Sequence, residues 1–257
     1  MGYTIAVTGK GGCGKTTISG LMISSLIRNG MAPVLAVDAD PNSCLDSVMG
    51  VTVHKSVGTV REEARKIAAA NEVTGVSKRE LLELKISESL VEAEDFDLVA
   101  MGRSEGPGCY CYANNVLGAV IREISDNYPY VVIDNEAGLE NLSRRIVKSV
   151  DLLVLVAEPS MNGLRTVARL YDLALEMDIE YRALAVVVNR VRSDGVSAIA
   201  DEVAQKIKAD YMVMIPMDDE IAGYGEKGMS LRNLPVENIV VREVDRFMRT
   251  VMQRGEE

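Results

Sequence analysis

Residues 9–17 read GKGGCGKTT, and this stretch indicates the fold. It fits the pattern G-x-x-x-x-G-K-[ST], follows a short apolar run, and precedes helical periodicity that we expect to begin at Thr16. Glycines at these spacings let backbone N–H groups surround phosphates, and a helix N-terminus adds partial positive charge. We therefore predict a nucleotide-binding loop that contains Gly11, Gly12, Cys13, Gly14, Lys15, Thr16 and Thr17.

Outside this loop, short β-branched apolar runs alternate with stretches of helical periodicity. Seven strands are predicted, at residues 3–8, 34–38, 97–102, 130–134, 152–157, 183–189 and 211–215. Several runs are continuously apolar, which is typical of a parallel sheet covered on both faces. We predict a single α/β P-loop domain over residues 1–257, a three-layer sandwich with a mainly parallel sheet of about seven or eight strands. Residues 52–94 are charged and helix-prone.

The loop predicts roles for two of its side chains, and two acidic segments elsewhere add further candidate site residues. Lys15 is expected to reach the β- and γ-phosphates, and the Thr16 hydroxyl to ligate Mg²⁺. Asp38 ends the second predicted strand, Asp40 follows it, and Asp134 ends the fourth. Carboxylates there suit the waters of a Mg²⁺ ion or the orientation of an attacking water, although either of the first two is also a favoured helix N-cap.

Composition excludes several functional classes. The formal net charge is −10 and no Lys/Arg cluster is visible, which argues against nucleic acid as a partner. No apolar run approaches the roughly 18 residues of a membrane span, so we expect a cytoplasmic protein without a membrane partner. Four cysteines in such a chain do not indicate a disulfide framework.

Cys109 and Cys111 form a C-x-C pair in a turn-rich loop after the third predicted strand. Two thiolates can bind one soft metal ion, but a closed tetrahedral site needs four ligands. Two-fold symmetry would bring the same loop of a second subunit to the axis and complete a four-sulfur site. A redox disulfide and incidental thiols are the alternatives.

Lys10, directly after the first glycine, narrows the class of P-loop protein to which the chain can be compared. With this lysine the loop resembles the deviant Walker A of the family that includes septum-site and partition ATPases and the nitrogenase iron protein. The resemblance implies an ATP-dependent homodimer in which Lys10 crosses the interface to the partner's nucleotide. It also implies that Asp40 acts in hydrolysis, together with Lys10 and Lys15, and that Asp38 and Asp134 belong to the magnesium shell.

The base is expected to lie near Asn189, at the end of the sixth predicted strand. A guanine-specific N-K-x-D motif would need an aspartate at position 192, where the chain has Arg192, so ATP is favoured over GTP. In the deviant Walker A family an asparagine at this point contacts adenine. The resemblance implies that backbone from residues 216–218, beginning with Pro216, stacks beside the base.

The combined motifs resemble the CooC/AcsF family, nickel-handling ATPases that mature carbon monoxide dehydrogenase or acetyl-CoA synthase. The matching segments are the loop at 9–17, DADPNSCL at 38–45, GCYC at 108–111 and DNEAGLEN at 134–141. The resemblance implies Ni²⁺, or Zn²⁺ in its place, held between subunits by Cys109 and Cys111 and delivered to a nickel-enzyme client. Cys13 replaces the more usual valine, and we expect Cys44 to serve in buried packing.

Two other functions remain alternatives. A nitrogenase-type iron–sulfur ATPase would need a further cysteine within residues 134–145, and none is present. A MinD/ParA-like positioning ATPase acts by polymer formation, membrane binding or DNA binding, and would need a basic amphipathic tail or a basic patch. Residues 238–254 instead predict a closing helix whose apolar side packs on the sheet.

Overall fold

The structure of the chain, a computed structural model, describes residues 2–42, 44–60, 62–63, 88–102, 124–139, 149–192 and 197–255. Within these residues lies one eight-stranded sheet with the order β3-β4-β2-β5-β1-β6-β7-β8. The strands are β1 (Tyr3–Gly9), β2 (Val34–Ala39), β3 (Leu90–Glu92), β4 (Phe96–Ala100), β5 (Tyr130–Asn135), β6 (Ser149–Ala157), β7 (Glu180–Val191) and β8 (Tyr211–Pro216). The helices are α1 (Lys15–Arg28), α2 (Leu45–Met49), α7 (Met161–Glu176), α8 (Ser197–Lys206), α9 (Asp219–Glu226) and α10 (Ile239–Gly255), with short 3-10 turns η1 (Ser125–Asn127) and η3 (Leu231–Asn233).

The sheet is parallel except where β3 pairs antiparallel with β4, which confirms the predicted fold class. The seven predicted strands are all present, with ends that differ by one or two residues or, in β6 and β7, by three. The eighth strand, β3, lies within the segment that the sequence indicated to be helix-prone. Its three residues are too few to show a period, and its pairing with β4 is a tertiary contact.

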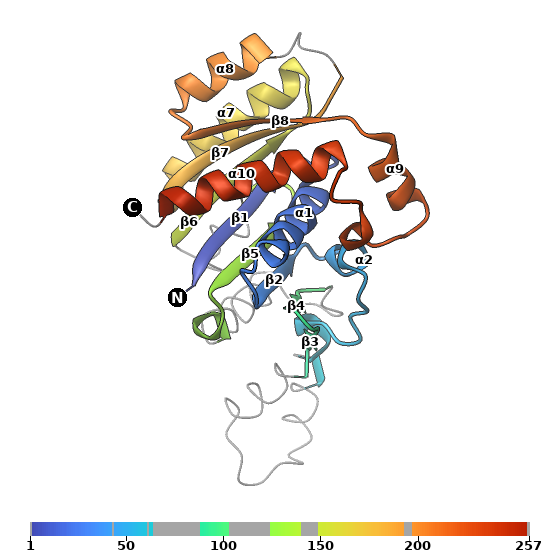
Figure 1. The fold of residues 1–257 in the computed structure, drawn as a ribbon. Coiled ribbons are helices and arrows are strands. Elements are labelled where there is room, and N and C mark those ends of the chain that lie inside the picture. Colours follow the sequence, from blue (N-terminus) through green and yellow to red (C-terminus); the bar gives the residue numbers. More distant parts are fainter. Residues whose placement is uncertain are drawn as a thin grey trace.

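Both faces of the sheet are covered, as the continuous apolar runs indicated. In β1, Ile5 and Val7 face the core shared with α1 and α10, whereas Ala6 between them faces the core shared with α7 and α8. All three side chains are fully buried. Figure 1 shows α1 and α10 side by side on one face of the sheet.

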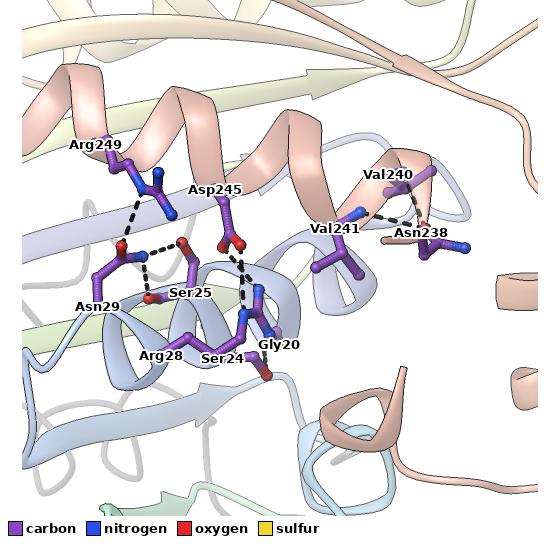
Figure 2. A network of polar contacts seen from close by, with 10 residues as sticks. All are labelled: Gly20, Ser24, Ser25, Arg28, Asn29, Asn238, Val240, Val241, Asp245 and Arg249. Atoms are coloured by element: carbon purple, nitrogen blue, oxygen red, sulfur yellow. Dashed lines mark hydrogen bonds and ion pairs between the residues drawn. The ribbon is translucent and has the colours of Figure 1, made fainter. Parts of the chain in front are cut away.

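The closing helix α10 packs as predicted. It also contacts α1, the helix that directly follows the glycine-rich loop. Its predicted apolar positions are all buried: Val241, Val244, Phe247, Met248 and Val251. At the C-terminal end of α1, Arg28 Nη2 lies 2.7 Å from Asp245 Oδ1, and Arg249 Nε donates to Asn29 Oδ1 at 3.0 Å (Figure 2). Asn238 Oδ1 accepts the Val240 N–H at 2.9 Å at the start of α10. These contacts fix the helix that follows the loop.

Parallel strands end along one edge of the sheet, and the loops that follow them meet there. Asp38 lies in β2 directly opposite Asp134 in β5, and β5 pairs on its other side with β1. The glycine-rich loop follows β1, and Asn189 lies near the end of β7. The topology therefore brings the predicted site residues of four strands to one edge.

Candidate nucleotide-binding site

The glycine-rich loop connects β1 to α1, which begins at Lys15, one residue before the predicted start. Gly12 and Gly14 have φ angles of 81° and 96°, in the left-handed region that other residues rarely adopt. Gly14 has a second constraint, because a Cβ there would lie 2.2 Å from Asn189 Nδ2. The glycines at these two positions are therefore required by backbone conformation and, at Gly14, by packing.

Two donors of the loop converge on one oxygen. Lys15 is buried, and its Nζ donates to the Lys10 carbonyl at 3.4 Å. The Cys13 N–H donates to the same carbonyl, also at 3.4 Å. The converging directions of an ammonium and a backbone N–H are those that bind a phosphate oxygen. The Lys10 side chain is exposed.

A cavity of about 500 Å³ opens over this loop and brings together residues from the ends of four strands. Its lining includes members of the glycine-rich loop, Asp40 and Asn42 from beyond β2, Glu136 and Ala137 from beyond β5, and Arg190 from β7. Its size and its donors suit a polyphosphate. Asp40 and the predicted loop residues other than Cys13 thus share one cavity.

Asp38 and Asp134 are buried side by side, and Asp134 accepts a hydrogen bond from Thr16, which lines this cavity. Burial, followed by the charge of Asp134, raises the pKa of Asp38 to about 7. Burial also raises the pKa of Asp134 to about 6, although hydrogen bonds from Thr16 and Ser19 lower it. Two carboxylates that resist ionisation together form a place where a cation would be favourable.

Neither Asp38 nor Asp40 is the helix N-cap that the sequence offered as an alternative, because Cys44 is the N-cap of α2. Asp38 Oδ2 accepts the N–H of Leu45, the first residue of α2, at 2.9 Å, so this carboxylate also satisfies a helix N-terminus. Asp40 lines the cavity, and its Oδ1 accepts the backbone N–H of Asn42 at 2.8 Å. These bonds hold the turn that follows β2.

Cys44 corrects one expectation, because its side chain is exposed and not part of the core. Leu45, its neighbour, is the fully buried residue of this turn. The sequence could not distinguish the two, since a turn before a five-residue helix has no period to show which side faces inward. Cys13, in contrast, is buried under the loop.

A second cavity, of about 870 Å³, adjoins the first and shares Gly12, Thr17 and Arg190 with it. Asn189 and Pro216, the two residues expected near the base, both line it. Asn189 also has a contact that sequence reasoning did not anticipate, because its Nδ2 donates to the Cys13 carbonyl at 3.0 Å.

Two further residues of the site escaped the sequence analysis. Ser19 donates from its hydroxyl to Asp134 Oδ1 at 3.0 Å; its position three residues after Thr16, on the same helix face, was the available signal. Arg190 donates from Nη1 to the Gly12 carbonyl at 3.2 Å, and no pattern in the sequence indicated this contact.

The predicted metal-binding cysteines, Cys109 and Cys111, lie outside the described residues. Within the part of the chain that is described, no group of three or more His, Cys, Asp or Glu side chains is placed to hold a metal ion. Across the same described ranges, no helix combines the length and apolar character that a bilayer crossing requires.

Comparison with known proteins gives a consistent picture. A family model described as an AAA domain matches residues 2–181. An uncharacterised ATP-binding protein of Methanocaldococcus jannaschii is 40% identical over 97% of this chain and 98% of its own length. The carbon monoxide dehydrogenase accessory protein CooC of Rhodospirillum rubrum is 32% identical over 90% of this chain and 89% of its own. The cell division ATPase MinD of Pyrococcus furiosus shares the fold, with a TM-score of 0.72 at 19% identity over 99% and 100% of the two chains.

Proposed function

This chain belongs to the AAA-domain family of P-loop ATPases, and we propose that it uses ATP to control the binding and delivery of nickel to an enzyme under maturation. The similarity to the carbon monoxide dehydrogenase accessory protein, over nine-tenths of the chain, is the observation that carries the proposal. The C-x-C pair at residues 109–111 adds soft-metal ligands to it. The client is a carbon monoxide dehydrogenase or an acetyl-CoA synthase.

In the proposed site the phosphates of ATP occupy the smaller cavity and the base the larger one. Lys15 Nζ and the loop N–H groups bind the phosphates, which replace the Lys10 carbonyl as their acceptor. Asn189 and the backbone around Pro216 contact the adenine. The shared border of the two cavities allows one nucleotide to fill both.

Mg²⁺ fits the residues next to the phosphate cavity. Thr16, Asp38 and Asp134 would hold it, the aspartates through water, and its charge would favour the ionised form of both carboxyls, whose pKa values burial raises. When bound, Mg²⁺ neutralises charge on the phosphates. Asp40, on the cavity wall, orients the attacking water.

Lys10 has an exposed side chain, as a residue needs to have if it is to reach a second subunit. In the proposed homodimer it contacts the partner's phosphates and ties closure to ATP. Closure changes the spacing of four thiolates, two from each subunit, that hold Ni²⁺ or Zn²⁺ as cargo. Hydrolysis reopens the dimer.

Equilibrium nickel binding by reduced protein tests the proposal, with stoichiometry read by native mass spectrometry. Wild type is compared with Cys109→Ser/Cys111→Ser and with Cys44→Ser, a matched control because Cys44 is an exposed thiol at another place. We expect one ion per two subunits, lost in the double variant and kept in the control. Binding that persists without the C-x-C pair, or no binding by wild type, would refute the nickel proposal.

Dimer control is tested separately with Lys10→Ala, and exposed Lys227→Ala serves as the control. Sedimentation with Mg-ATP should show that the first variant stays monomeric while the control dimerises. An unchanged dimer equilibrium in Lys10→Ala would contradict the role of Lys10.

The second candidate is a positioning ATPase of the MinD type, favoured by the shared fold. Membrane attachment through α10 would require its apolar side, which is buried against the sheet and α1. Cosedimentation with anionic vesicles in Mg-ATP distinguishes the candidates: binding would favour MinD-type positioning. An iron–sulfur absorption band in anaerobically purified protein would instead favour a nitrogenase-type ATPase.

A further inference from the structure

Arg190 has an unusual backbone for its place in the sheet. It lies within β7 with a φ angle of 61°, in the left-handed region that costs energy for a side chain with a Cβ. The pairing of β7 with β8 shifts register between Val188 and Val191, so a bulge brackets this residue. Bulges re-aim side chains, often beside active sites.

The side chain of Arg190 is aimed at the glycine-rich loop. Its Nη1 donates to the Gly12 carbonyl at 3.2 Å, and the preceding Asn189 donates from Nδ2 to the Cys13 carbonyl at 3.0 Å. Asn189 Oδ1 accepts the Arg190 N–H at 3.0 Å, which ties the two residues together. Two successive carbonyls of the loop are thus held by two successive residues of β7.

Held carbonyls determine where the N–H groups of the same peptides point. In a planar trans peptide the C=O and the N–H point in opposite directions. Because the carbonyls of Gly12 and Cys13 are drawn toward β7, the N–H groups of Cys13 and Gly14 are turned away from it. The Cys13 N–H accordingly points at the Lys10 carbonyl, where Lys15 Nζ also donates.

We propose that Arg190 is a positioning residue that, with Asn189, orients the loop N–H groups for the phosphates of the nucleotide. The inference rests on the phosphate site proposed above and adds a residue to it. Arg190 acts through the loop and its effect is on polyphosphate binding, whatever the base. The strained backbone and the bulge serve to direct its guanidinium to the Gly12 carbonyl.

Arg190→Gly is the sharpest test, because it removes the side chain and relieves the positive φ together. We expect the variant to keep the melting temperature of wild type or exceed it, yet to bind Mg-ADP roughly fivefold more weakly, the loss of one modest hydrogen bond. Calorimetric titration should show the same factor for inorganic tripolyphosphate, which has no base. Arg190→Lys, whose Nζ can donate to the same carbonyl, should recover most of the affinity.

The control is Arg182→Ala, which removes the same charge from the exposed opposite end of β7 and should bind both ligands as wild type does. Loss of Mg-ADP affinity with unchanged tripolyphosphate affinity would assign Arg190 to base recognition and overturn the inference. Wild-type affinity in Arg190→Gly would overturn it as well, while leaving the ATP site intact. Failure of wild type to bind Mg-ADP would instead refute the nucleotide site itself.

Discussion

The two ends of α1 differ in how the charged side chains around them are arranged. At its N-terminal end, Asp38 and Asp134 are buried next to each other, and the direct bonds described for them come from backbone N–H and hydroxyl donors. At its C-terminal end, Arg28 is paired with Asp245 across the contact with α10 (Figure 2). In the proposed function the charges at the first end serve a ligand, whereas the charges at the second end pair with each other. One helix therefore has a functional end and a stabilising end.

The largest effect is expected at the functional end, from Lys15→Ala. Removing its Nζ from the phosphate cavity should lower the rate of ATP hydrolysis about 100-fold or more, because it takes away charge that stabilises the transition state. Phosphate release measures the rate. Thermal melting should show an intact fold, and Lys227→Ala should hydrolyse ATP normally; near-normal hydrolysis by Lys15→Ala would contradict the proposed site.

The buried carboxylates give the next largest effect, on stability against pH in metal-free protein. The pKa of Asp38 is raised from 3.8 to about 7, so the folded state binds more protons than the unfolded state between these values. The free energy of unfolding should therefore fall as pH rises from 4 to 7, and Asp38 contributes at most about 1.4 kcal/mol per pH unit to this fall. Urea denaturation in EDTA measures it.

Asp38→Asn should make that fall shallower, since this side chain no longer ionises and only the contribution of Asp134 remains. Asp172 is exposed, and Asp172→Asn should leave the profile unchanged. Adding Mg²⁺ to the wild-type protein at pH 8 should raise its free energy of unfolding again. A wild-type profile that rises with pH over this range would contradict the raised pKa of Asp38.

At the stabilising end, Arg28→Ala should lower the free energy of unfolding by about 1 kcal/mol. The pair with Asp245 is largely shielded, with side-chain exposures of 23% and 14%, and it forms charge-assisted hydrogen bonds. A double-mutant cycle with Asp245→Ala in urea isolates the coupling. Hydrolysis should change less than about twofold, and a matching loss of activity would show that the two ends are not separable.

Arg249→Ala should have the smallest effect, at most about 0.5 kcal/mol. Its bond to Asn29 Oδ1 is exposed, and exposed polar contacts contribute little. The same urea titration measures it. A loss as large as that of Arg28→Ala would mean that the α1–α10 contact acts as one cooperative network.

Local sequence pattern was sufficient to predict the elements that show a clear hydrophobic pattern or contain a compact motif. The glycine-rich loop was predicted because its glycines and Lys15 lie within nine residues, and the strands because each is covered on both faces. The closing helix was predicted because its apolar side recurs with helical period. In contrast, β3 and the exposure of Cys44 escaped prediction, since both lie in segments too short to show a period.

The sequence by itself determined the fold class, the nucleotide loop and the acidic residues near the carboxyl ends of β2 and β5. Only the tertiary structure decided that Asp38 faces Asp134, and that Asn189 reaches Cys13 across 176 residues of chain. Such contacts depend on strand order and register, which packing of the whole sheet sets and no local pattern encodes. For the same reason Arg190 became visible as part of the site only once β7 was placed beside the loop.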